Sequence, residues 1–148
     1  MNRFVFRLAR VLQLRVGVEK QRAQDLGRAI QEEQARREAL ARAEERLQRM
    51  GQQLAGSGAD VAPAGTLHNL HLTVEAASSQ VERATEAAAA AEKVVEVEQN
   101  RFGEARRDRK VLEQLRERRR TDWNQESSRQ EQRELDEIAR QLRAGGES

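Results

Sequence analysis

Hydrophobic residues recur along most of this 148-residue chain at intervals of three and four positions, the spacing of one face of an α-helix. In the second half the pattern is nearly unbroken from Leu67 to Leu112. Its positions are Leu67, Leu70, Val74, Ala77, Val81, Ala84, Ala88, Ala91, Val95, Glu98, Phe102, Ala105, Arg109 and Leu112. The pattern predicts a helix over about residues 66–143, whose alanine-rich seam lets a partner helix approach closely.

The first half of the chain carries a weaker version of the same pattern. Its main feature is a ladder of positions spaced seven residues apart, five of them leucines and two glutamates: Leu12, Glu19, Leu26, Glu33, Leu40, Leu47 and Leu54. A second row of apolar residues accompanies this ladder, but it moves from one side of the ladder to the other. It consists of Val16, Ala23 and Ile30 on one side and, later in the chain, of Ala43 and Met50 on the other. We therefore predict a first helix over about residues 3–54, with a seam that drifts around it.

One break separates the two helical stretches. Gly56, Gly58, Pro63 and Gly65 predict a hinge over residues 55–65, with Thr66 as the N-cap of the second helix. A single hinge between two long helices predicts an antiparallel hairpin. With the turn centred near residue 60, facing residues have numbers that add up to about 120.

The expected fold is therefore all-α, a long antiparallel two-helix coiled-coil hairpin forming a single domain over residues 1–148. The second helix outruns the first, so its C-terminal end overhangs after about Arg120. The overhang carries Trp123, Leu135, Ile138 and Leu142. Apolar residues on an unpaired helix favour a partner groove, and the alternative is a frayed or disordered tail.

Composition agrees with long helices rather than with a globule. Charged residues make up 35% of the chain and aromatic residues 3%, while Ala, Glu, Lys, Leu and Arg together account for 83 of 148 residues, above the half that is typical of coiled coils. Residues 101–120 hold nine basic and four acidic side chains, and residues 121–148 hold four basic and seven acidic. Alternating charged patches of this kind steer contacts with partners.

Catalysis finds little support in the sequence. Cysteine and tyrosine are absent, and no glycine-rich phosphate loop occurs, so we expect neither an enzyme nor a cofactor. His68 and His71 share a helix face and could supply two metal ligands. Two surface or seam histidines are the favoured interpretation, and no metal is expected.

The chain is expected to be cytosolic. No apolar run approaches the roughly 18 residues of a membrane span, so direct membrane insertion is not expected. Arg7, Arg10 and Arg15 interrupt any signal-peptide core at the N-terminus.

Two features near the overhang have alternative interpretations. Arg116, Arg118, Arg119 and Arg120 form a basic cluster. The favoured interpretation is a solvated helix face, followed closely by a site for an acidic protein partner. Nucleic-acid binding ranks a distant third, because no aromatic residues are interspersed for base stacking. We expect no nucleic-acid partner. Trp123 is interpreted as a plug at the open end of the coiled coil beside Phe4 and Phe6, with a binding hot spot as the alternative.

Three stretches near the ends of the chain carry a further signal: Phe4 to Arg15 followed by Glu19, residues 115–118, and residues 131–139. Together with the length and the two-helix layout, they resemble the flagellar export protein FliJ family. The alternative is a generic structural coiled coil that dimerises through its overhang, or a stalk of a related secretion or rotary ATPase.

The resemblance implies a non-catalytic, central-stalk-like component of the flagellar type III export apparatus with a general chaperone role. Such a protein would bind and stimulate the hexameric export ATPase FliI, contact the export gate protein FlhA and help to cycle export chaperones. It would be cytoplasmic and peripherally associated with the cytoplasmic face of the cell membrane at the flagellar base.

The resemblance also implies which residues meet these partners. The ATPase-facing set would be Arg7, Leu8, Leu12, Arg15, Leu115, Glu117, Arg118, Asp136 and Glu137. The gate-facing set would lie near the hinge: Leu67, Leu70, Val74 and Ala77. The aromatic residues often seen near the hinge in the family are absent from this chain.

Overall fold

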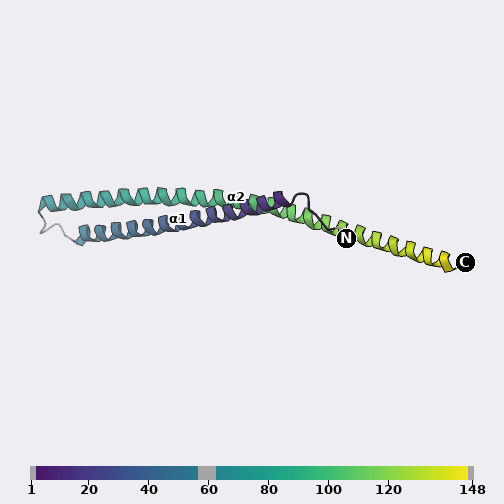
Figure 1. Cartoon of the computed structure of the whole chain (residues 1–148). Coiled ribbons are helices and arrows are strands. Elements are labelled where there is room, and N and C mark those ends of the chain that lie inside the picture. The colour runs from purple at the N-terminus through teal and green to yellow at the C-terminus, as the bar shows by residue number, and fades with distance from the viewer. Residues whose placement is uncertain (1–2, 57–62, 147–148) are drawn as a thin grey trace. The chain divides into compact units, whose positions relative to one another are not determined.

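The structure is a computed structural model that describes residues 3–56 and 63–146. Within these residues there are two helices and no strand: α1 (Ala9–Gly56) and α2 (Ala64–Gly146). They pack against each other as a helical hairpin (Figure 1), which confirms the predicted all-α fold. The chain divides into two compact units, unit 1 (residues 1–19 and 104–148) and unit 2 (residues 20–103). The single domain over residues 1–148 stays a prediction.

The helix boundaries differ from the expected ones mainly at the N-terminus. The first helix was expected from Arg3, but α1 begins at Ala9; residues 3–6 have no regular secondary structure and residues 7–8 form a turn. At its other end α1 continues to Gly56 instead of residue 54. α2 begins at Ala64 and ends at Gly146, instead of spanning residues 66–143. Of the expected hinge 55–65, residues 57–62 lie outside the described residues.

Thr66 is not the N-cap of α2. The Thr66 amide donates to the Pro63 carbonyl over 2.9 Å, and the Leu67 amide donates to the same oxygen over 3.3 Å. Thr66 therefore lies inside the first turn, and the residue before the helix is Pro63. A proline is acceptable there because the first amides of a helix have no partner within it.

Unit 2 is a slender pair of antiparallel helical segments with a seam of small residues. Its buried side chains are Ala29 and Ala43 from α1, and Ala77, Ala91 and Val95 from α2. Small side chains let two helix backbones approach closely. All fourteen positions of the stripe predicted between Leu67 and Leu112 are buried or half-buried, so that part of the prediction is confirmed.

The seam of α1 does not drift as predicted. Val16 and Ile30 are 45% and 44% exposed, and Ala23 is exposed as well. The half-buried or buried companions of the leucine ladder instead include Arg22 and Ala29, which continue the side occupied later by Ala43 and Met50. Arginine can take a seam position because its aliphatic stem covers apolar surface while its charge stays in water.

The register of the hairpin is shifted from the expected one. In unit 2, Arg46 Nη1 donates to Gln80 Oε1 over 2.7 Å, and in unit 1 Arg15 pairs with Asp108 over 3.4 Å. With the turn centred near residue 60, each partner would have been about three to six residues earlier in the chain. The spacing pattern alone could not show this shift.

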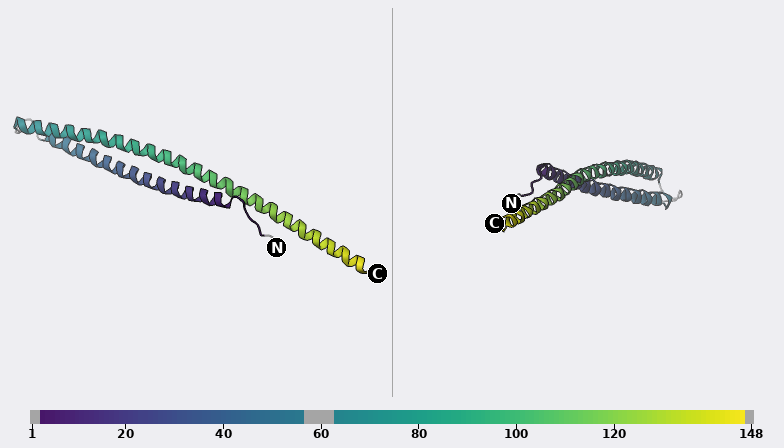
Figure 2. Two further views of the ribbon diagram at one scale, coloured as in Figure 1. Left: turned by 45° about the horizontal axis from the view of Figure 1, so that its top comes forward. Right: turned by 90° about the vertical axis from the view of Figure 1, so that its right-hand side faces the viewer.

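In unit 1 the helix pair gives way to a single helix. Leu12 and Ala105 are buried between the start of α1 and the matching part of α2. The N-terminal segment lies beside α2, and the C-terminal part of α2, yellow in Figure 2, has no neighbouring segment. Every residue from 128 to 146 is exposed. The predicted overhang is therefore present in unit 1.

Candidate functional site

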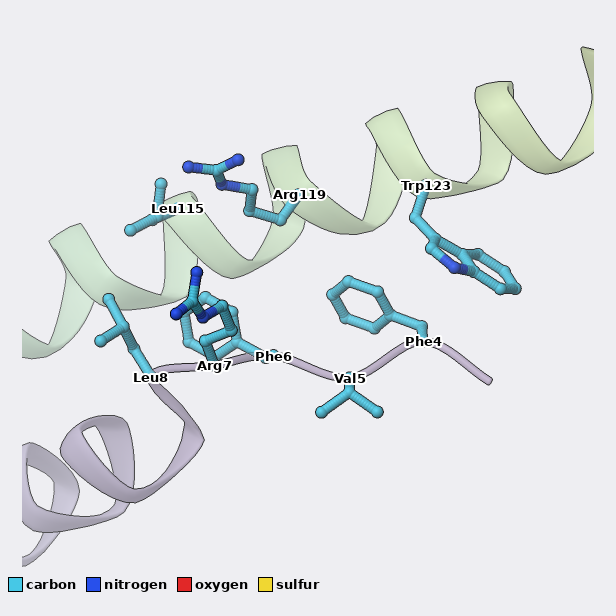
Figure 3. A pocket seen from close by; sticks show the side chains of 8 residues that line it. All are labelled: Phe4, Val5, Phe6, Arg7, Leu8, Leu115, Arg119 and Trp123. Carbon is cyan, nitrogen blue, oxygen red and sulfur yellow. The ribbon is translucent and has the colours of Figure 1, made fainter. Parts of the chain in front are cut away.

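A short N-terminal strap, residues 3–8, lies along α2 in unit 1. Phe4 and Phe6 are half-buried, whereas Val5 between them is 75% exposed. Figure 3 shows Phe4 turned toward Trp123 and Val5 turned away from α2. The Phe4 and Trp123 ring centroids are 6.1 Å apart with planes tilted by 57°, a favourable aromatic geometry. The pairing agrees with the sequence-based interpretation of Trp123 as a plug.

The strap and α2 enclose an open groove of about 610 Å³. Its lining is mostly apolar, with one arginine from each side: Phe4, Val5, Phe6, Arg7, Leu8, Leu115, Arg119 and Trp123. Apolar walls with a few convergent polar groups are typical of binding sites. We name this feature the terminal groove.

An ion-pair cluster joins α1 to α2 behind the terminal groove. The Arg109 guanidinium donates to the Glu19 carboxylate on α1 and, over 2.6 Å, to Glu113 one turn further along α2. The side chains of Arg109 and Glu19 are only 20% and 18% exposed. These hydrogen bonds, first to Glu19 and then to Glu113, raise the pKa of Arg109 above its ordinary value. The guanidinium therefore stays charged at any physiological pH.

The C-terminal part of α2, residues 124–146, is the second component of the site, and we name it the tail; all of its residues except the half-buried Ser127 are exposed. Its apolar residues Leu135, Ile138 and Leu142 are 61%, 53% and 73% exposed. Its polar side chains pair locally: Gln132 donates to Asp136 over 3.2 Å, and Arg140 lies 3.9 Å from Glu137. Local pairs of this kind stabilise an isolated helix by a few tenths of a kcal/mol each, about 0.2–0.5.

The comparison with known proteins assigns a family. The model for the family described as "Flagellar FliJ protein" matches residues 4–148, nearly the whole chain. The chain belongs to the FliJ family. FliJ-family membership makes it a component of the flagellar protein export apparatus. No curated protein and no solved structure showed significant similarity. Among the described residues, neither helix combines the length and the hydropathy needed to cross a membrane.

In this FliJ-family chain, all nine residues of the implied ATPase-facing set belong to unit 1. Three of them, Arg7, Leu8 and Leu115, line the terminal groove. Leu12 is buried, with 7% of its surface exposed, and Arg15 is engaged by Asp108. Leu12 therefore supports the groove from inside unit 1, whereas the ion pair of Arg15 lies on its exposed surface.

The remaining four members of the set lie on exposed surface of α2. Glu117, Arg118, Asp136 and Glu137 are all exposed. Arg118 and Asp136 are 18 positions apart, five turns of an α-helix, and so they lie on the same face. The structure thus divides the set between the groove, one buried position (Leu12) and the exposed surfaces of α1 and α2.

The implied gate-facing set lies in unit 2 and is turned inward. Leu67, Leu70 and Val74 are half-buried, and Ala77 is buried with 4% of its surface exposed. These side chains form the seam near the hinge, so Ala77 offers no surface to a partner while the pair is closed. Their role at the gate stays a prediction.

The two histidines form no metal site in the part of the chain that the structure describes. His68 and His71 are exposed, and His71 Nε2 lies 4.0 Å from a Glu75 carboxylate oxygen. No group of three or more potential metal ligands occurs among the described residues.

The site residues that sequence reasoning undervalued are Phe4 and Phe6. The signal was the alternation of Phe4, Val5 and Phe6: residues two apart share a side only in an extended chain. In a helix, two such side chains would point about 200° apart.

Proposed function

We propose that this protein is a non-catalytic stalk that binds the hexameric export ATPase FliI through unit 1 and stimulates its activity. The observation that carries the proposal is the concentration of contact chemistry in unit 1. The terminal groove, the exposed tail and all nine residues of the implied ATPase-facing set belong to that unit.

The physical form of the chain supports this proposal. A stalk inside a ring must be slender and stiff, and paired helices with an alanine seam are both. Exposed, mixed-charge surfaces with little apolar area favour weak, exchangeable contacts over one tight interface. The tail carries exposed charged side chains along its described length, with Leu135, Ile138 and Leu142 as the large apolar residues among them.

Contacts with the export gate protein FlhA and with export chaperones belong to the same proposal. The gate contact would use the stretch of α2 from Leu67 to Ala77, either through its outer surface or after the seam opens locally. Such contacts would hold the protein at the cytoplasmic face of the membrane at the flagellar base.

The test is ATP hydrolysis by the cognate export ATPase, with and without the protein, measured together with the oligomeric state of the ATPase. Arg118→Glu and Asp136→Lys should each reduce the stimulation severalfold, because each reverses a charge on one exposed face of α2. Arg106→Glu serves as the matched control, since Arg106 is exposed in unit 1 and outside the implied set.

Circular dichroism should show unchanged helicity for all three variants. Normal stimulation by both Arg118→Glu and Asp136→Lys would show that the assigned contact face is wrong. A wild-type protein that neither stimulates the ATPase nor migrates with it would refute the stalk function itself.

A further inference from the structure

A shallow cleft lies along one flank of unit 2, between α1 and α2, and has a volume of about 370 Å³. Alanines form its floor, with two arginines and one amide at its sides: Arg36, Ala39, Gln80, Arg83, Ala84 and Ala87. Arg46 lies at its hinge end, because the Arg46 guanidinium donates to Gln80 Oε1 over 2.7 Å. We name this feature the flank cleft.

The flank cleft is basic. Arg36 is paired with Glu32 on its own helix, over 2.8 Å. Arg83 is exposed and makes no ion pair in the described part of the chain, and Arg46 is bonded to a neutral amide. Positive charges without matching carboxylates favour an acidic ligand.

An apolar strip continues from the flank cleft along α2. Ala87 lines the cleft, Ala90 is exposed, and Val94 is 52% exposed. Counted from Arg83, the intervals to these residues are four, three and four positions, so all four residues share one face of the helix. This face therefore has an unpaired cation at its hinge end and apolar side chains along the rest.

The tail carries a face with the same intervals and complementary chemistry. Glu131, Leu135, Ile138 and Leu142 are again spaced four, three and four positions apart. The three apolar residues are more than half exposed, and Glu131 is exposed and makes no ion pair within the described residues. The four arginines of the tail all lie more than 90° around the helix from the centre of this face. The exposed apolar face of the tail is therefore acidic.

We propose that the tail of one copy of this protein docks as a third helix on the flank cleft of a second copy, parallel to its α2. Glu131 of the first copy then faces Arg83 of the second. The three apolar residues of the tail lie in order on Ala87, Ala90 and Val94. Small side chains in the cleft let the third helix approach closely.

The direction of docking follows from the order of charges and apolar residues. In both faces the charged residue comes first along the chain, followed by three apolar residues. An antiparallel tail would set Glu131 on Val94 and leave Arg83 facing Leu142, which desolvates both charges without pairing them.

The contact is heterologous, because it joins two different surfaces of the chain. Each copy in a pair keeps either a free tail or a free flank cleft, so further copies can add head to tail. The four facing pairs bury little surface and include one exposed ion pair. The association is therefore weak, concentration-dependent and sensitive to salt.

The self-association is independent of the proposed ATPase contact. Asp136 lies about 160° around the helix from Glu134 and Ile138, on the other side of the tail. Association between copies is measured without the ATPase, so its failure leaves the stalk proposal standing, and the reverse also holds.

Cross-linking tests the alignment directly, because the chain has no cysteine. Ala90→Cys and Ile138→Cys, mixed as two separate proteins under mild oxidation, should give a mixed disulfide dimer, since these positions face each other across the contact. The dimer is identified by its mass. Ala89→Cys replaces Ala90→Cys in the control, because position 89 is exposed but lies 100° further around α2.

Two outcomes of this experiment would overturn the proposal. One is an equal yield of mixed dimer with Ala89→Cys and with Ala90→Cys. The other is a homodimer of Ile138→Cys that forms more readily than the mixed dimer, because it would show that tails pair with tails.

Charge exchange tests the ion pair. In sedimentation velocity at low salt, Arg83→Glu and Glu131→Arg should each weaken the association by about fivefold. The double variant should restore it, since the same pair forms with reversed signs. Lys20→Glu is the matched control in unit 2, because Lys20 is exposed and lies about 160° around α1 from Arg36.

The control should stay within about twofold of wild type. Failure of the double variant to restore association would refute the pairing of Arg83 with Glu131. A wild-type mass that does not rise with concentration up to about 1 mM would refute the self-association itself.

Discussion

Units 1 and 2 are built from the same two helices but treat their apolar residues differently. Unit 2 buries small side chains, of which four are alanines, and leaves four large hydrophobic residues exposed. Unit 1 is the shorter unit, yet it holds nine of the thirteen exposed large hydrophobic residues, and also the Phe4–Trp123 contact. Unit 2 thus uses its apolar surface for its own pairing, and unit 1 keeps much of its own available for partners.

The comparison separates stability from contact within one hairpin. A seam of alanines gives little burial per residue but keeps the helix pair narrow, so unit 2 suits the role of a shaft. The side chains of the strap, the groove and the tail are largely exposed, so they contribute little to the stability of the fold. Variants in the two units should therefore fail in different ways.

The largest effect is expected in the seam of unit 2. Ala91→Glu should lower the free energy of unfolding by about 3 kcal/mol, because it buries a carboxylate at a position that is 8% exposed and has no provision for a charge. Far-UV circular dichroism during urea unfolding measures this change. Ala90→Glu, at the exposed neighbouring position, should stay near wild type. Equal losses in the two variants would show that the seam is not where the structure places it.

A smaller effect is expected at the strap of unit 1. Phe4→Ala should remove the ring contact with Trp123, lower the stability of unit 1 by about 1 kcal/mol, and shift tryptophan fluorescence toward longer wavelengths as the indole meets water. Trp123 is the only tryptophan and the chain has no tyrosine, so the signal reports on this site alone. Val5→Ala is the control, because Val5 points away from α2. An unshifted spectrum for Phe4→Ala would contradict the docked strap.

The smallest effect is expected at two helical glycines, one in each unit. Gly17→Ala and Gly27→Ala should each raise stability by about 0.5–1 kcal/mol, because a Cβ at either position meets nothing within 4 Å. Amide hydrogen exchange should show the gain around residue 17 in unit 1 and around residue 27 in unit 2. A loss of stability in either variant would mean that the glycine serves a close contact.

The sequence predicted α2 better than α1, for a physical reason. On α2 the seam positions are nearly all apolar, so the three-four spacing identified a single face of the helix as the seam. On α1 the ladder of leucines allowed companions on either side, and Val16 and Ile30 made the wrong side more hydrophobic. Arg22 and Ala29 occupy the seam instead, and only the position of the facing helix decides between the two sides.

The terminal groove shows a second limit of sequence reasoning. Phe4 and Trp123 were expected to be neighbours, and the structure confirms their contact. The extended strap was not predicted. The arginines and leucines just after it favour a helix, so the first helix was extended over Phe4, Val5 and Phe6 in spite of their alternation. Ion pairs such as that between Glu19 and Arg109 depend on which residues of the two helices face each other. The register predicted from the spacing differed from the observed one by several residues, so these pairs could not be predicted.

The sequence distances bridged by the two units have a consequence for how the protein forms. Arg46 and Gln80 in unit 2 are 34 residues apart in the chain, whereas Arg15 and Asp108 in unit 1 are 93 residues apart. Closing a longer loop costs more conformational entropy, so pairing should begin near the hinge and close last at the strap. On a ribosome the partners of the strap are made only after about four fifths of the chain, and the N-terminal aromatic residues would stay exposed until then. By the same entropy argument, the end of the molecule that closes last is expected to open first, as the exchange of partners proposed for unit 1 would require.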